Sequence, residues 1–153
     1  MIRRFAIAEK SMTPLLQEGD YVVTRRRPPL LGDIVVFEHP HRPGFHLVKR
    51  VIGTRGDTVE IKEGKVFLNG RQLSEPWTTD YTTPDGKWHV PDHHVFVLGD
   101  ARGRSTDDGR TIGPLPFGES ADVVVFRYWP PAGFGRVRTP GPTADLQWTR
   151  RER

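Results

Sequence analysis

Short runs of Val, Ile, Phe and Leu alternate with Gly, Pro, Asp and Asn along most of the chain. Apolar runs of this length, rich in β-branched and aromatic residues and bounded by turn-forming residues, predict short strands. The predicted strands cover residues 20–24, 33–38, 46–52, 58–62, 65–68, 94–98 and 122–128. The pattern therefore predicts a mostly β domain with short strands rather than long helices.

Two tight turns stand out in the middle of this pattern. Glu63-Gly64 separates the strands at 58–62 and 65–68, and Asn69-Gly70 follows directly. Such two-residue sequences between apolar runs are typical of β-hairpins. From residue 74 to 91 the alternation gives way to Pro, Thr and Asp, so we expect a surface excursion there, held in place by Trp77 and Trp88.

Length and composition fit one domain with a real core. We expect a catalytic domain over residues 1–135 of the 153, followed by a polar, disordered tail over 136–153. The chain has no cysteine, which excludes a disulfide framework, a thiolate nucleophile and a cysteine-bound metal. The net charge of +4 suits an anionic partner, but the basic residues are scattered and no nucleic-acid partner is expected. The run Arg25-Arg26-Arg27, followed by two prolines, is expected to form an exposed turn.

No apolar run approaches the ~20 residues that a membrane-spanning helix requires. The protein as given is therefore expected to be soluble, with peripheral membrane contact at most. If an anchor precedes Met1 in the natural protein, we expect it to place the domain at the outer face of the cytoplasmic membrane.

One lysine stands inside the apolar strand at 46–52. The 23 basic residues include only five lysines, which are Lys10, Lys49, Lys62, Lys65 and Lys87. Arginine stays protonated in proteins, whereas a lysine in apolar surroundings can lose its proton near neutral pH and act as a base. The candidate nucleophile is Ser11, in the sequence Ser11-Met12-Thr13-Pro14. Serine activated by lysine is a known variant of nucleophilic catalysis.

Other constellations have less specific spacing. Two groups of histidines lie close in sequence, namely His39, His41 and His46, and His89, His93 and His94. Neither has the spacing of a metal-ligand motif, so no metal is expected. A Ser, His and Asp triad can be assembled from several residues, but no spacing selects one. The polar segment 99–110 is by itself typical of a solvated loop, yet it could carry the group that orients the lysine amine.

Several motifs together resemble the ordered boxes of bacterial type I signal peptidases. They are residues 11–16 with Gly19-Asp20, residues 32–37, residues 48–53 with Gly56-Asp57, Asn69-Gly70, and Gly99-Asp100 through Ser105 and Asp107. The resemblance covers about residues 5 to 130. It implies a catalytic domain of coiled antiparallel sheets with a hairpin extension.

The resemblance also implies roles for individual residues. Ser11 matches the nucleophile, Lys49 the general base, and Ser105 the serine that hydrogen-bonds the lysine amine. Supporting positions of the same box are Gly99, Asp100, Asp107 as the acidic brace, and Arg110. The peptide would bind as an added strand beside the segments that flank Ser11 and Lys49. These segments contain Phe5, Ala6, Ile7 and Ala8, and His46, Leu47 and Val48.

The largest departure from the family pattern concerns the membrane anchor that normally precedes the nucleophile, since only ten residues stand before Ser11 in the sequence as given. Three features of the motifs depart as well. Glu9 and Lys10 precede the nucleophile, where the family usually has glycine or serine that helps to form the oxyanion hole. Ala101 stands where asparagine is usual, and aligning Arg110 requires one additional residue around Asp108-Gly109.

The resemblance implies a serine endopeptidase that removes signal or leader peptides after small residues, without a cofactor. Its partners would be secretory or leader-bearing polypeptides. One alternative is a soluble protease that trims the leader of one specific protein, like those proposed to mature nickel superoxide dismutase. Another is a self-cleaving regulator of the repressor type, for which the ten residues before Ser11 leave no room for a DNA-binding module.

Overall fold

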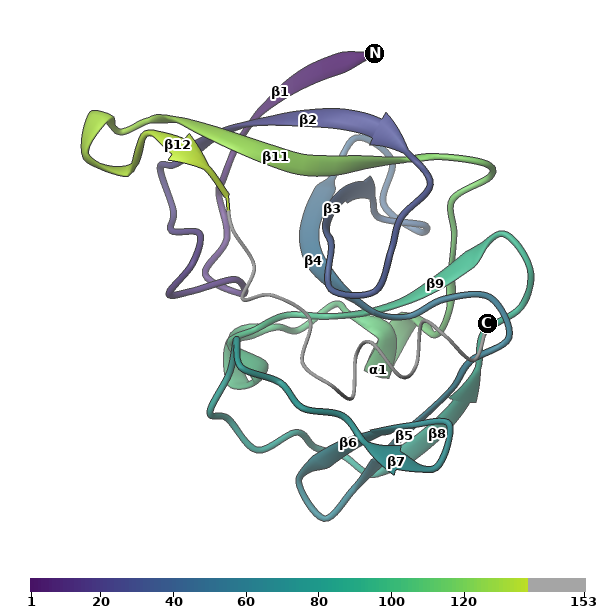
Figure 1. The fold of residues 1–153 in the computed structure, drawn as a ribbon. Coiled ribbons are helices and arrows are strands. Elements are labelled where there is room, and N and C mark those ends of the chain that lie inside the picture. The colour runs from purple at the N-terminus through teal and green to yellow at the C-terminus, as the bar shows by residue number, and fades with distance from the viewer. Residues whose placement is uncertain (138–153) are drawn as a thin grey trace.

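The structure, a computed structural model, describes residues 1–137 and contains two antiparallel β-sheets (Figure 1). The larger sheet has eight strands in the order β1-β2-β11-β3-β4-β9-β10, with β12 paired to β11. Its strands are β1 (Ile2–Ala6), β2 (Tyr21–Arg27), β3 (Ile34–Glu38), β4 (His46–Gly53), β9 (His94–Leu98), β10 (Leu115–Pro116), β11 (Ala121–Trp129) and β12 (Gly135–Arg136). The prediction of a mostly β fold with coiled antiparallel sheets is confirmed.

The smaller sheet forms the lower part of Figure 1 and has the order β7-β6-β5-β8. Its strands are β5 (Thr58–Lys62), β6 (Lys65–Leu68), β7 (Arg71–Gln72) and β8 (Gly86–His89). Within residues 1–137, helical structure is limited to α1 (Gly109–Ile112) and two 3₁₀ turns, Arg102–Arg104 and Pro131–Gly133. This sheet is the predicted hairpin extension.

Both predicted tight turns are present in the smaller sheet. Glu63 and Gly64 have φ values of 52° and 79°, and Asn69 and Gly70 have 53° and 83°. Positive φ at both central positions is the geometry of a type I′ hairpin turn, whose twist matches that of the strands. The sequence Asn-Gly thus forms the turn for which it is typical.

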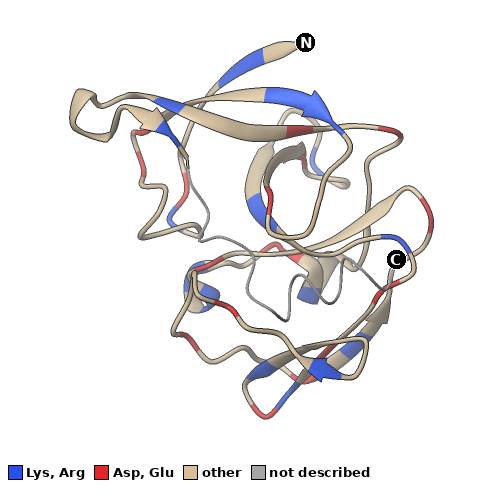
Figure 2. Ribbon diagram, in the orientation of Figure 1, with Lys and Arg blue, Asp and Glu red and all other residues tan. Residues whose placement is uncertain are grey.

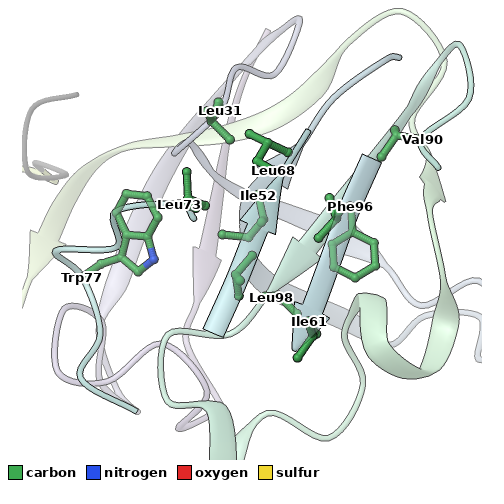
Figure 3. Packing of buried hydrophobic residues seen from close by; sticks show 11 residues of the cluster. Leu31, Ile52, Ile61, Leu68, Leu73, Trp77, Val90, Phe96 and Leu98 are labelled. Atoms are coloured by element: carbon green, nitrogen blue, oxygen red, sulfur yellow. The ribbon is translucent and has the colours of Figure 1, made fainter. Parts of the chain in front are cut away.

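The segment 74–91 is more regular than predicted, because β8 lies within it and pairs with β5. Trp88 of this strand packs on Phe96, with ring centroids 4.8 Å apart. Trp77 is 7% exposed and belongs to the cluster in Figure 3, which joins the small sheet to Ile52 and Leu98. Both tryptophans therefore hold this segment against the core, as expected.

The basic run at 25–27 does not form the turn that was predicted but lies at the end of β2. Arg27 donates two hydrogen bonds to Asp33, of 2.7 and 3.0 Å, and Arg26 and Arg3 both contact Asp122. Asp33 and Asp122 thus compensate the positive charges of these arginines, so the basic run can belong to a strand. Elsewhere too, basic and acidic residues are interspersed over both sheets (Figure 2).

The packed part of the chain extends slightly beyond the expected boundary at residue 135. Arg136 belongs to β12, and Val137 packs against the core cluster that contains Met12 and Leu16. The predicted tail over 136–153 otherwise lies outside the described residues.

Strand β4 runs through the centre of the molecule and contributes to three apolar clusters. Val48 packs with Ile7 and Met12, Val51 with residues of β9 and β11, and Ile52 with the small sheet. All its residues except His46 are buried. The side chain of Lys49 is therefore removed from water.

Candidate active site

Ser11 lies in the loop that follows β1 and is 1% exposed. Two buried apolar residues of the same loop, Met12 and Leu16, anchor it in the core. The Ser11 carbonyl accepts a 2.8 Å hydrogen bond from the Ala101 N–H, which ties the loop to the segment after β9. The backbone of the candidate nucleophile is thus fixed from two sides.

Lys49 lies opposite Val35 in the β3–β4 pair, and its side chain is 2% exposed. Burial lowers the pKa of Lys49 below its ordinary value, while the negative charge of Glu9 opposes this change. A lowered pKa makes the neutral amine accessible at milder pH, which a general base requires.

The carboxylate of Glu9 contacts both of these side chains. Its Oε2 accepts hydrogen bonds from Ser11 Oγ at 3.2 Å and from Lys49 Nζ at 3.4 Å. Ser11 Oγ also lies 3.4 Å from the Val48 carbonyl oxygen. The sequence identified Glu9 only as a departure from the family pattern, and nothing in its spacing signals this bridging position.

Ser105, 8% exposed, lies in the loop after β9 and donates a 2.7 Å hydrogen bond to Asp108 Oδ2. Among the described residues, the Lys49 amine has its hydrogen bond with Glu9, and the bond expected with Ser105 is not formed. Because the Ser105 hydroxyl donates to Asp108, its oxygen lone pairs stay available to accept a bond.

The acidic residue that braces the Ser105 loop is Asp108, which corrects the assignment of Asp107. Asp108 is 1% exposed and accepts bonds from Ser105, from the Arg110 side chain at 2.9 and 3.0 Å, and from the Arg110 N–H. Burial alone would raise its pKa, but the hydrogen bonds from Arg110 and Ser105 hold the pKa of Asp108 below the ordinary value. Asp107 instead lies 3.8 Å from His39 Nε2. The additional residue in this box therefore lies between Ser105 and its brace.

Arg110, which was predicted as a supporting residue, also contacts the loop backbone. It donates to the carbonyl oxygens of Arg102, at 2.9 Å, and Ser105, at 3.0 Å. The Asp108–Arg110 pair thus fixes both ends of the segment that presents Ser105.

Gly99 allows the Ser11 and Ser105 segments to approach each other. A Cβ at this position would overlap the Ser105 hydroxyl and lie 2.9 Å from the Ser11 carbonyl oxygen. A residue with any side chain would therefore separate the two serines.

Asp100 ties the same loop to β4. It accepts two hydrogen bonds from Arg50, of 2.7 and 2.8 Å, and the guanidinium carbon lies 4.6 Å from the Trp77 ring centroid. Burial raises the pKa of Asp100, and the Arg50 charge opposes this rise. Because Arg50 directly follows Lys49, this pair sets the position of the loop relative to the candidate base.

The predicted peptide-binding residues line one small cavity of about 50 Å³. Its walls are Phe5, Ala6, Ile7, Ala8 and Glu9 on one side, with Val36, His46, Leu47 and Val48 on the other. Within residues 1–137, β1 is an edge strand, and the pairing of β4 with β9 begins only at Arg50. Two strand edges thus border the cavity with backbone groups that an extended peptide could bind.

The histidines are dispersed over separate contacts. His39 Nδ1 accepts a hydrogen bond from the His41 N–H, His93 Nδ1 lies 3.0 Å from the Gly118 carbonyl oxygen, and His94 Nδ1 lies 2.7 Å from that of Asp92. In the described part of the chain, no three His, Asp or Glu side chains are arranged to hold a metal ion. Residues 1–137 likewise contain no helix long and apolar enough to cross a membrane.

Comparison with known proteins identifies the family. The pattern of the family described as "Signal peptidase, peptidase S26" matches residues 1–129. A probable signal peptidase I-1 of Synechocystis sp. is 34% identical in an alignment 158 residues long, which covers 90% of this chain and 79% of that protein. The chain therefore belongs to the signal peptidase family, as its motifs implied.

Two further relatives define the extent of the similarity. Thylakoidal processing peptidase 1 of Arabidopsis thaliana is 34% identical over 83% of this chain, but the chain spans only 42% of that protein's length. The crystal structure of a signal peptidase I from Enterococcus faecalis matches with a TM-score of 0.55 and 30% identity, over 63% of this chain and 97% of that one. These relatives give no support to the single-substrate protease or the repressor-type regulator.

Proposed function

We propose that this protein is a serine endopeptidase that removes signal or leader peptides, with Ser11 as nucleophile and Lys49 as general base. The observation that carries the proposal is a buried lysine of lowered pKa whose amine and the Ser11 hydroxyl share one contact, the Glu9 carboxylate. Family membership and the open strand edges beside Ser11 support it.

The reaction has two steps. Ser11 Oγ attacks the scissile carbonyl carbon while neutral Lys49 Nζ takes its proton, and the proposed donor to the developing oxyanion is the Ser11 N–H. The tetrahedral intermediate then expels the leaving amine, which receives the proton from Lys49. Lys49 Nζ, neutral again, then deprotonates a water molecule, which hydrolyses the acyl-enzyme and restores Ser11. Serine and lysine supply every proton transfer, so the reaction requires no metal or cofactor.

The cavity beside Ser11 favours small substrate side chains. Its volume of about 50 Å³ suits a side chain such as that of alanine, and its apolar walls come from Ile7, Val36 and Val48. The substrate class is therefore an extended polypeptide with small residues before the cut, as in secretory or leader-bearing precursors.

Cleavage of synthetic signal peptides tests the proposal. Purified protein should cut them after a small residue, with the position read by mass spectrometry, and activity should persist in a strong metal chelator. Ser11→Ala should lose activity at least about a hundredfold while its circular dichroism stays unchanged. Equal cleavage by Ser11→Ala would refute the assignment of the nucleophile.

We also infer peripheral contact with a membrane surface through the end of the large sheet that carries β12. Tyr21, Trp129 and Phe134 are 41%, 51% and 66% exposed there, and Tyr21 pairs with Trp129. Exposed aromatic side chains suit the boundary between lipid headgroups and acyl chains. Trp129→Ala with Phe134→Ala should weaken flotation with phosphatidylglycerol-containing vesicles. Tyr81→Ala, at an 81% exposed position in the segment before β8, should not.

A further inference from the structure

The reaction described above makes no use of the Glu9 carboxylate, although it touches both reacting side chains. Its Oε2 lies 3.2 Å from Ser11 Oγ and 3.4 Å from Lys49 Nζ. The Glu9 side chain is 23% exposed, whereas that of Lys49 is 2% exposed. The carboxylate therefore reaches from the protein surface into the space between nucleophile and base.

This position conflicts with the chemistry of the first step. Lys49 must be neutral to accept the serine proton, but a carboxylate in contact with the amine favours the ammonium ion. Ser11 Oγ must turn toward Nζ, but its hydroxyl donates to Glu9. The negative charge also disfavours an oxyanion nearby, since like charges repel most strongly where water is scarce.

The other charged groups that face Lys49 come from the loop after β9. Asp108 is neutralised by Arg110 and hydrogen-bonded to Ser105, and Asp107 lies 3.8 Å from His39. Both carboxylates favour the ammonium form, but their effect on the pKa of Lys49 is smaller than that of Glu9. Glu9 is therefore the carboxylate that acts most directly on the amine.

We propose that Glu9 is a positioning residue that holds Lys49 as an ammonium ion and occupies the Ser11 hydroxyl in the free enzyme, so that activity begins only where pH disrupts this pair. The catalytic part of this inference rests on the proposed function. Glycine or serine at this position would carry no carboxylate to hold the Lys49 amine and the Ser11 hydroxyl. Glu9 would therefore shift the pH range in which the enzyme is active toward higher pH.

Glu9→Gln tests the inference, since the amide keeps the shape of the side chain and removes its charge. The titration of Lys49 can be followed without substrate by NMR of lysines labelled with ¹³C at Cε, with the Lys49 signal assigned by its loss in Lys49→Met. The midpoint should fall by about one pH unit in Glu9→Gln, because an opposite charge at this distance contributes roughly that much. The acid limb of kcat/KM should move down equally, which raises kcat/KM about tenfold at a pH on that limb.

Glu18→Gln is the matched control. It removes the same charge from an exposed residue of the following loop and should move neither the midpoint nor the limb. An unmoved Lys49 midpoint in Glu9→Gln would overturn the inference, as would a loss of activity at every pH with the limb in place. If the wild type cleaves no peptide but Glu9→Gln still lowers the midpoint, the Glu9–Lys49 coupling holds and the peptidase proposal fails.

Discussion

Two adjacent buried cations, Lys49 and Arg50, have different electrostatic surroundings. A guanidinium group stays protonated in proteins, so a buried arginine requires a counter-ion. Arg50 is 0% exposed and has one, through two hydrogen bonds to Asp100. Lys49 is 1% exposed and has one longer contact with Glu9, so burial still lowers its pKa. The choice of lysine at 49 in an arginine-rich chain is therefore consistent with a base that must be deprotonated.

The two neighbouring aspartates 107 and 108 form a matched pair for mutation. Asp108→Asn should reduce the free energy of unfolding by about 2 kcal/mol, because it weakens charge-assisted hydrogen bonds from Ser105 and Arg110. It should also lower kcat, since Ser105 loses its orientation. Asp107→Asn should change both less. Urea unfolding and peptide cleavage measure the two effects, and the reverse order would restore Asp107 as the brace.

The stabilisation by Asp108 should depend on pH. Its pKa is lower in the folded protein than the unfolded value of ~3.9, so the ionised group stabilises the fold above that pH. This contribution is lost as pH falls through the lower, folded value. The difference in unfolding free energy between wild type and Asp108→Asn should shrink over this acidic range. A difference that stays constant there would contradict the lowered pKa.

At the scale of strands and loops, the sequence predicts those strands whose own side-chain pattern identifies them. The strands at 58–62, 65–68 and 94–98 have the predicted bounds, because apolar alternation and flanking Gly or Asn coincide. β8 was missed because Gly86-Lys87-Trp88-His89 has one apolar residue, and its pairing depends on the neighbouring strand β5. Short strands such as β10 and β12 likewise form through tertiary contacts.

For the candidate site, the sequence predicted residues but not the contacts between them. Lys49 was singled out because a lysine is unusual inside an apolar strand, and Ser11 because its motif resembles that of the nucleophile. Their shared contact with Glu9 depends on how β1 and β4 approach. The register of the Ser105 loop could not be read either, since two consecutive aspartates fit its motif equally well. The side chain that bonds Ser105 is decided by the turn into α1, where Asp108 caps the helix.

Mutation of two glycines distinguishes an effect on the candidate site from an effect on stability alone. Gly99→Ala should abolish most cleavage, because a Cβ there overlaps the Ser105 hydroxyl. Gly70→Ala meets no atom within 4 Å, but its φ of +83° is unfavourable for alanine. It should cost about 1 kcal/mol of stability and leave kcat/KM unchanged. Thermal unfolding and peptide cleavage of both variants provide the comparison, and full activity in Gly99→Ala would contradict the described approach of the two serines.

At the scale of the whole molecule, curling of the large sheet brings β1 and β4 to one cavity, although three strands separate them in the sheet order. Phe5 and His46 meet across it, with ring centroids 5.6 Å apart. The small sheet packs against the far end of β4 through Ile52 and contributes no residue to the wall of this cavity. The architecture thus brings Ser11, Lys49 and two strand edges to one place.

Strand addition predicts a period of two along the substrate. Successive peptide N–H groups of a strand point to opposite sides, so N-methylation at one position should break a bond to β1 and at the next a bond to β4. At positions outside the stretch that lies between the two strand edges, methylation should have little effect. Each lost bond should lower kcat/KM up to about tenfold. An equal effect of N-methylation inside and outside this stretch would argue against binding as an added strand.

The most direct test of the central claim is the kcat/KM of Lys49→Arg with a signal peptide, measured across pH beside wild type. Arginine keeps the positive charge and much of the volume of lysine but supplies no neutral amine. With Lys49 as the base, the variant should fold and yet lose at least about a hundredfold in kcat/KM at every pH. Cleavage by the folded Lys49→Arg variant at a rate close to wild type would contradict the assignment.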